Sequence, residues 1–199
     1  MDRTNSLNLS RSYQMAETED ILEKLRECFQ KAEKDEKEGK KHKGLLLKKS
    51  DDAEAKRYIQ KAKESLEFCE LCRQKEYDYK IPEEWFYTLY YCALAILSKF
   101  GIETRSQKYT ALFLQYVKDK GLIDYDLEFI NRIMVYTKKG EESEVDERED
   151  ARYSSSTKIE RVNERYLEMT MLCKRAIEQA EEIIYSNNPL KFPQEIITK

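Results

Sequence analysis

Residues 82–101, PEEWFYTLYYCALAILSKFG, form the most apolar segment of the chain. Pro82 suits the first turn of a helix, where its missing N–H is not needed, and the two glutamates after it favour the positive end of the helix dipole. The side chains that follow are apolar on almost every side, and such a helix packs in the middle of a bundle. Gly101 is typical of the residue that ends a helix. The segment therefore predicts a central helix.

Amphipathic helices are expected on both sides of this segment. Apolar residues recur there at three- and four-residue steps, and no segment alternates with the two-residue period of a strand. Only five glycines and three prolines occur in 199 residues, which favours helix. The sequence predicts an all-α, antiparallel up-and-down helical bundle with a core of four to five helices. The further helices are expected at residues 17–37, 51–75, 106–118, 125–137 and 155–185.

The chain is expected to divide into four parts. Residues 1–16 are rich in serine and asparagine and are predicted to be disordered. Residues 17–50 are predicted to add one helix and a lysine-rich loop, which reads GKKHKGLLLKKS at residues 39–50. The bundle itself is assigned to residues 51–187, and residues 188–199 are predicted to be a flexible tail.

Composition and charge argue against several classes of protein. The formal net charge of -3 is too small for bulk attraction to nucleic acid or to a membrane, but it is compatible with a local basic patch. No window approaches eighteen apolar residues, and the N-terminus lacks the apolar stretch of a signal peptide. The five scattered cysteines fit reduced thiols. A cytoplasmic protein without membrane association is predicted.

Two cysteines, Cys69 and Cys72, share the apolar face of the expected helix at residues 51–75. A tetrahedral zinc site needs a second pair of Cys or His ligands, which the sequence lacks. A redox pair usually lies at a helix N-terminus, where the thiol pKa is lowered. Core packing is therefore the favoured interpretation, and neither a metal site nor a cofactor is predicted.

His42 and several aromatic residues are weaker candidates for function. His42, the only histidine, is expected to be solvated, with no carboxylate in view to position it as a base. Most of the aromatic run from Trp85 to Tyr91 is expected in the core, whereas Tyr77 and Tyr79 are the better candidates for exposed contacts. A basic cluster offers either phosphate contacts or a solvated linker, of which the linker is favoured. Its lysines are at positions 40, 41, 43, 48 and 49.

Several stretches from residue 51 onward carry a resemblance to a known family. They are AEAKRYIQKAKESLEFCE at 53–70, WFYTLYYCALAILSKFGI at 85–102, SQKYTALFLQYV at 106–117 and REDARYSSS at 148–156. Their order resembles the HEPN family (higher eukaryotes and prokaryotes nucleotide-binding domains), whose members are small all-helical bundles and often dimers. The resemblance covers residues 51–187, and Tyr109 stands where many relatives have histidine.

The string at residues 148–153 is the most specific part of this resemblance. In active members of the family, an arginine followed four to six residues later by a histidine forms a metal-independent RNase site at a dimer cleft. Arg148 matches the arginine, but positions 153–155 hold tyrosine and two serines. A second branch carries Arg-x-x-Ala-Asp-Tyr, which Arg148, Ala151 and Tyr153 match, while Arg152 replaces the aspartate.

The resemblance implies binding without catalysis. A histidine would activate the ribose hydroxyl, whereas tyrosine, with an unperturbed pKa of about 10, is a poor base at neutral pH. Arg148, Arg152 and Tyr153 are the predicted nucleotide- or RNA-binding residues, and Arg148 and Tyr153 are the catalytic candidates if the site is active. The alternative for Arg148 and Tyr153 is a structural brace at the start of the last helix.

The functional prediction is a non-catalytic HEPN-like module that forms a homodimer and binds RNA, a nucleotide or a protein partner. In the family a common partner is a small nucleotidyltransferase that acts as an antitoxin, so a toxin–antitoxin-like pair is implied. One alternative is an RNase toxin with a degenerate active site. The other is a purely structural helical adaptor.

Overall fold

The computed structural model describes residues 3–134, 160–186 and 190–198, with side chains described from residue 18 onward. No helix among these residues combines the length and the apolar character needed to cross a membrane. The described elements are α1 (Arg3–Lys37), β1 (Leu45–Leu47), α2 (Asp52–Gln74), η1 (Asp78–Lys80), α3 (Ile81–Lys99), β2 (Ile102–Thr104), α4 (Gln107–Asp119), α5 (Leu127–Arg132), α7 (Glu160–Tyr185) and η2 (Gln194–Ile196), where η marks a 3₁₀ helix.

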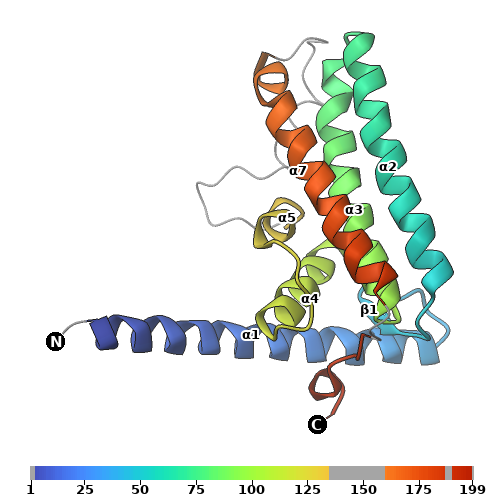
Figure 1. The fold of residues 1–199 in the computed structure, drawn as a ribbon. Helices are drawn as coiled ribbons and strands as arrows, with labels where there is room; N and C mark the ends of the chain where they lie inside the picture. Colours follow the sequence, from blue (N-terminus) through green and yellow to red (C-terminus); the bar gives the residue numbers. More distant parts are fainter. Residues whose placement is uncertain (1–2, 135–159, 187–189, 199) are drawn as a thin grey trace.

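Three long helices, α2, α3 and α7, form the body of the molecule, and α3 packs against both of the others (Figure 1). Helix α2 is antiparallel to α3, because Lys99 at the end of α3 pairs with Asp52 at the start of α2. Helix α7 is antiparallel to α2 and runs in the same direction as α3. Tyr166, near the start of α7, contacts both Glu70 near the end of α2 and Trp85 near the start of α3. The prediction of an all-α helical bundle is confirmed.

Local sequence signals explain where these helices begin. Asp51 caps α2, with its side chain accepting a hydrogen bond of 2.8 Å from the backbone N–H of Glu54. Ser106 caps α4 in the same way, through the backbone N–H of Tyr109 at 3.4 Å. Pro82 lies in the first turn of α3, as its sequence predicts. Each signal acts within one turn, so it can be recognised without the tertiary fold.

Helix α3 supplies much of the core. Trp85, Leu89, Cys92 and Ile96 are each no more than 1% exposed. The ring of Trp85 lies 6.0 Å from that of Tyr166, which joins α3 to α7. Burying a large apolar side chain contributes about 1.5–3 kcal/mol, so α3 is a main source of the stability of the fold.

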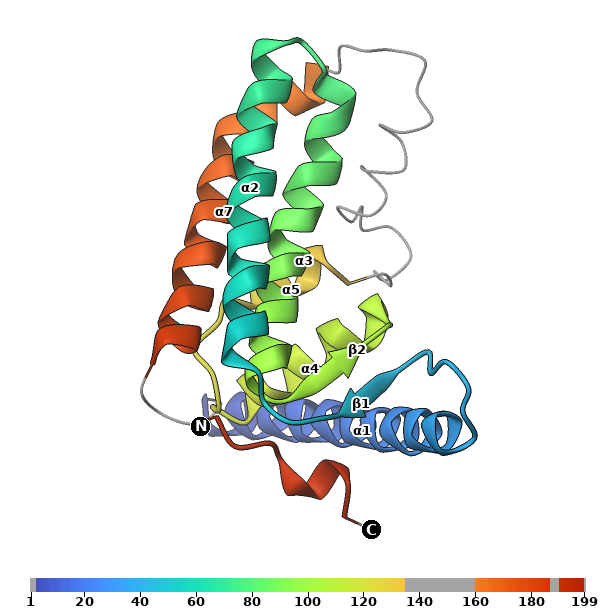
Figure 2. The same ribbon diagram turned by 90° about the vertical axis from the view of Figure 1, so that its right-hand side faces the viewer.

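Helix α1 crosses one end of the bundle, next to a two-stranded ribbon (Figure 2). Strands β1 and β2 pair antiparallel, with Leu46 opposite Glu103, and Leu45 is fully buried. The expectation of a loop throughout residues 39–50 is wrong for Leu45–Leu47. Three residues are too few to show alternation, and the partner strand lies far away in sequence.

The helix boundaries differ from the prediction at two places, the start of α1 and the two ends of α5. Helix α1 begins at Arg3, so residues 3–16, expected to be disordered, are helical in the structure. Extending an existing helix adds one hydrogen bond for each residue fixed, which a polar composition does not prevent. Helix α5 is limited to Leu127–Arg132, and α7 is described from Glu160, with residues 155–159 outside the described residues.

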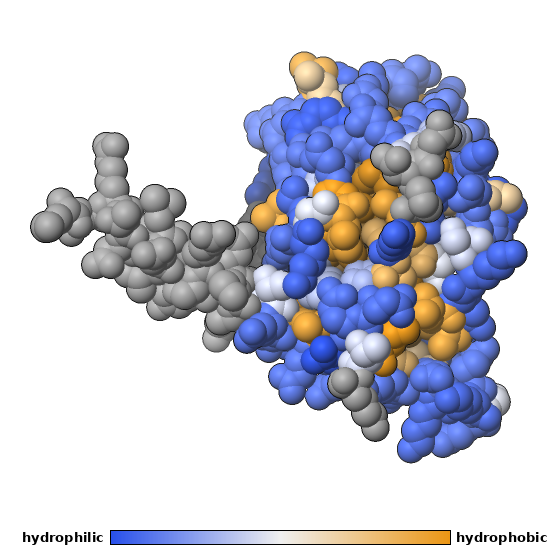
Figure 3. Space-filling view, turned by 60° about the horizontal axis from the view of Figure 1, so that its bottom comes forward, coloured by the Kyte–Doolittle hydropathy of each residue, from blue (hydrophilic) through white to orange (hydrophobic). Residues whose placement is uncertain are grey.

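The segment 190–198 packs against α1 and α4, so the expectation of a flexible tail is wrong for these residues. The ring of Phe192 lies 5.4 Å from that of Phe29 in α1 and 6.1 Å from that of Phe113 in α4, and Ile196 is fully buried. Apolar surface framed by hydrophilic side chains is visible from this end of the molecule (Figure 3). The two helices create a docking surface that the linear sequence does not reveal.

We expect Gly101→Ala to lower the free energy of unfolding by about 2–3 kcal/mol. Gly101 has a φ of +75°, and a Cβ there would lie 2.7 Å from the carbonyl oxygen of Lys48 and 2.9 Å from the backbone nitrogen of Ser50. Gly39 is the matched control, because its φ is +68° but no atom lies within 4 Å of a Cβ placed there. Gly39→Ala should lower the free energy of unfolding by about 1 kcal/mol. Chemical denaturation measures both, and equal losses would contradict the close approach at Gly101.

Candidate functional site

The predicted site residues Arg148, Arg152 and Tyr153 lie outside the residues that the structure describes. Their roles in binding, catalysis or bracing therefore stay predictions. The nearest described part of the chain after them is the start of α7. There Asn163 donates a hydrogen bond of 2.9 Å to the carboxylate of Asp78, a buried residue in the connection between α2 and α3. The start of α7 is thus tied to that connection.

A pocket at the other end of the bundle is lined by basic residues alone: Lys41, His42, Lys43 and Arg105. The first three belong to the connection between α1 and β1, and Arg105 follows β2 directly. The backbone N–H of Arg105 donates to the carbonyl of Gly44 at 3.1 Å, which extends the pairing of the two strands. Strand pairing therefore brings the two halves of this basic pocket together.

Gly44 sets the position of the loop that carries most of the basic pocket. A Cβ at Gly44 would lie 2.7 Å from the sulfur of Cys28 and 3.3 Å from its carbonyl oxygen, so a larger residue would displace the loop or the Cys28 side chain. The next residue, Leu45, donates its backbone N–H to the same sulfur at 3.3 Å. The lysines before Gly44 are consequently held beside α1 and the ribbon.

His42 is buried, with a side chain 1% exposed, so the expectation of a solvated histidine is wrong. Its Nε2 lies 3.0 Å from Oε1 of Glu103, a partner 61 residues away. Its Nδ1 is buried and has no hydrogen-bond partner among the described residues. No local pattern could reveal this pair, because the chain brings the two residues together only through the ribbon.

The carboxylate of Glu103 holds the basic pocket together. Burial raises the pKa of Glu103, but the hydrogen bond from His42 and the charges of His42 and Arg105 outweigh it, so the net effect is a lowered pKa. Arg105 Nε also donates to this carboxylate at 3.2 Å. Glu103 is therefore ionised at neutral pH and orients both groups. Lys41 and Lys43 are exposed and form no ion pair within the described part of the chain, so they leave positive charge for an anion.

Two other lysines of the predicted basic cluster form ion pairs. Lys48 pairs with Glu36 at 3.0 Å, and Lys40 pairs with Glu38. These pairs lie on the surface, where each contributes little to stability but neutralises local charge. The structure thus selects Lys41 and Lys43 from the cluster and adds Arg105, which the sequence did not single out.

Cys69 and Cys72 lie in the core, as predicted, at 0% and 1% exposure. Burial raises the pKa of both thiols, most strongly that of Cys69, which makes the reactive thiolate form scarce. Within residues 3–134, 160–186 and 190–198, no three His, Cys, Asp or Glu side chains gather in a way that could hold a metal ion.

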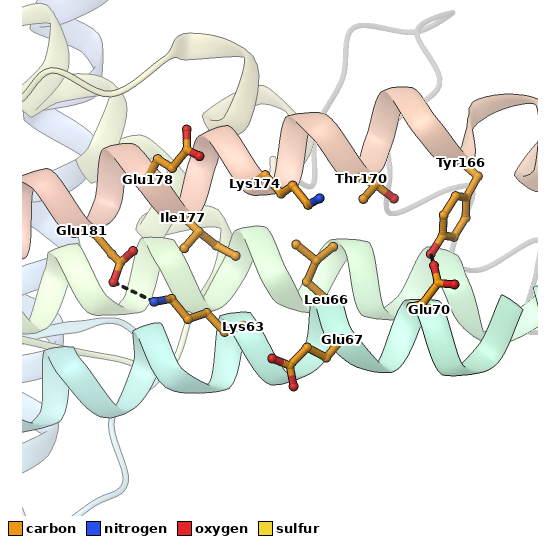
Figure 4. Close-up of a pocket in the computed structure, with 10 residues that line it drawn as sticks. All are labelled: Lys63, Leu66, Glu67, Glu70, Tyr166, Thr170, Lys174, Ile177, Glu178 and Glu181. Carbon is orange, nitrogen blue, oxygen red and sulfur yellow. Dashed lines mark hydrogen bonds and ion pairs between the residues drawn. The ribbon is translucent and has the colours of Figure 1, made fainter. Parts of the chain in front are cut away.

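A groove runs between α2 and α7 (Figure 4). It is bridged by an ion pair between Lys63 and Glu181 at 2.9 Å and by a hydrogen bond from Tyr166 to Glu70 at 2.8 Å. Burial, together with this hydrogen bond, raises the pKa of Tyr166 to about 12. The groove contains more carboxylates than ammonium groups, which disfavours phosphate. These charged residues are Glu67, Glu70, Glu178, Glu181, Lys63 and Lys174.

The aromatic predictions are confirmed for Trp85 and Tyr77, whereas Tyr79, also expected to be exposed, is partly buried. Trp85 is 1% exposed and lies in the core, whereas Tyr77 is 51% exposed. Tyr87 and Tyr91, which the sequence placed with the core run, are only partly buried. Helix α3 is central, but the side of it next to α2 that carries these two tyrosines reaches the surface.

A scan of family models, a search of curated proteins and a search of solved structures each found no match to this chain. The structure itself shows an all-α helical bundle with a basic pocket at one end.

Proposed function

We propose that this chain is a non-catalytic, HEPN-like binding module whose ligand is RNA or a nucleotide. The observation that carries the proposal is the pocket lined only by Lys41, His42, Lys43 and Arg105. The resemblance from residue 51 onward and the all-α bundle support the class of domain. Dimerisation and a small nucleotidyltransferase-type partner follow from the resemblance and belong to the same proposal.

The chemistry of the basic pocket favours phosphate. Three cations, Lys41, Lys43 and Arg105, stand against one carboxylate, Glu103. Lysine ammonium groups act as point charges for phosphate, and the free edge of a guanidinium adds directional donors. Local charge of this kind binds a phosphate even when the whole chain carries a small negative charge.

The geometry of His42 supports binding rather than cleavage. General acid–base catalysis needs a nitrogen within reach of the reacting proton. One ring nitrogen of His42 is held by Glu103 and the other is buried. His42 therefore acts as a buried positioning group in the loop between Lys41 and Lys43, held by its contact with Glu103.

The test uses a fluorescently labelled single-stranded RNA and the full chain. We expect the variant with Lys41, Lys43 and Arg105 all replaced by Gln to bind at least about tenfold more weakly. The slope of the logarithm of the binding constant against the logarithm of the salt concentration, here called the salt slope, should be smaller in magnitude by about 2. We also expect the RNA to be recovered intact. Fluorescence anisotropy measures the affinity over a salt series, and a gel measures integrity.

The matched control replaces Lys24, Lys34 and Lys37 of α1 by Gln, which removes the same charge from exposed positions that pair along the helix. An equal loss of affinity in this control would show that only net charge matters and would contradict the pocket. Cleavage of the RNA that disappears in Arg148→Ala would contradict the non-catalytic part of the proposal.

A further inference from the structure

A row of three tyrosines lies on the face shared by α2 and α3. The ring of Tyr91 lies 5.7 Å from that of Tyr87, at 21° between the planes, and 6.3 Å from that of Tyr58, at 20°. All three side chains are partly exposed. The nearly parallel rings are stacked one beside the next, and we call these three residues the tyrosine row.

A cation covers part of the tyrosine row. The ammonium group of Lys61 lies 5.7 Å from the ring centre of Tyr58 and 5.5 Å from that of Tyr91. Such cation–π contacts hold a positive charge against the aromatic face. The surface thus combines flat rings with a charge suited to a phosphate.

The tyrosine row begins close to the basic pocket. The pKa of Tyr58 is raised by burial and then by the charges of its neighbours, among which is Glu103. Glu103 is the residue that holds His42 and Arg105 in the pocket. The start of α2 and the end of α3 lie next to the two-stranded ribbon that carries Glu103 (Figure 2). The two surfaces are therefore neighbours.

We propose that single-stranded RNA binds along this face, with a phosphate in the basic pocket and bases stacked on the tyrosine row. This inference rests on the proposed function and names its substrate class. Bases stack on aromatic side chains without regard to sequence, because every base has a π-face. The bases of a duplex are already stacked and paired, so their faces are not free for the tyrosines.

The charges around the tyrosine row are mixed, which sharpens the expected behaviour. Glu54 lies near Tyr58, and Glu84 lies near Tyr91, so the row has little excess positive charge. Stacking, rather than charge, must supply its share of the affinity. The tyrosines should consequently change the affinity without changing the salt slope, whereas the pocket lysines change both.

The test compares two double variants in fluorescence anisotropy with a labelled single-stranded RNA. Tyr58→Leu with Tyr91→Leu removes the rings and keeps apolar bulk, and we expect a loss of about tenfold or more with an unchanged salt slope. Tyr58→Phe with Tyr91→Phe keeps the rings, and we expect an affinity within about twofold of the wild type. A duplex of the same sequence should bind more weakly than the single strand and respond little to either variant.

The outcomes separate this inference from the proposed function. Binding of neither RNA nor a nucleotide by the wild type would overturn both, whereas binding of a nucleotide without RNA would overturn only this inference. Binding that depends on the pocket lysines but is the same in the Leu and Phe variants would overturn only the tyrosine row. If the Leu variant does not fold, photocrosslinking of the wild type to 4-thiouridine RNA decides: crosslinks at Tyr58, Tyr87 or Tyr91 support the inference, and crosslinks only elsewhere overturn it.

Discussion

Trp85→Ala lowers the free energy of unfolding by about 4–5 kcal/mol, which is a large loss for a single substitution. Trp85 is 1% exposed and its ring packs on Tyr166, so its removal opens a cavity between α3 and α7. Because the indole N–H has no hydrogen-bond partner among the described residues, the loss comes from packing alone. Urea denaturation followed by circular dichroism measures it, since the variant lacks the only tryptophan.

Tyr77→Ala is the control for Trp85→Ala. Tyr77 is 51% exposed at the turn before α3, so its loss should change the free energy of unfolding by about 0.5 kcal/mol or less. A Trp85→Phe variant should fall between the two, because it keeps an aromatic ring of smaller volume. A loss below about 1 kcal/mol for Trp85→Ala would contradict the central position of α3.

Ile196→Ala weakens the docking of the C-terminal segment by about 3–4 kcal/mol. Ile196 is fully buried, and its neighbour Glu195 fastens the segment through two hydrogen bonds. Tyr116 of α4 donates to the Glu195 carboxylate at 2.9 Å, and Arg26 of α1 donates to the Glu195 carbonyl oxygen at 2.9 Å. Loss of the Ile196 side chain thus loosens a contact that joins two helices.

Local opening limits how far this substitution can destabilise the whole chain. Once the docking energy is lost, the segment detaches and the bundle keeps the rest of its stability. Hydrogen exchange of residues 190–198 and trypsin cleavage after the exposed Lys191 should therefore increase more than global unfolding does. The control is Ile197→Ala, which changes the same residue type at 45% exposure. Equal protection in both variants would contradict the docked position of Ile196.

Much of the fold follows from residues close together in sequence. Pro82 and Gly101 bracket the central helix in the predicted places, and Asp51 and Ser106 cap two others through local hydrogen bonds. The burial of Cys69 was also predictable, because it lies on the apolar stripe of α2. These features depend on contacts within one or two helical turns.

The candidate site was far less predictable. The lysines of the basic pocket were visible as a cluster, but nothing near them indicated Glu103 or Arg105. Tyr91 belongs to the aromatic run that was expected in the core, and only the antiparallel packing of α2 on α3 stacks its ring against that of Tyr58. Arg148, Arg152 and Tyr153 rest on the resemblance to the HEPN family and stay predictions.

The sequence by itself determined that the chain is a helical bundle and which faces of its helices are apolar. Helical hydrogen bonds join residues four apart, so composition and period are enough to predict them. Only the tertiary structure decided that β1 pairs with β2, that His42 meets Glu103 and that residues 190–198 dock on α1 and α4. Each of these contacts joins distant segments, and its energy depends on shape and charge that exist only after the helices have packed.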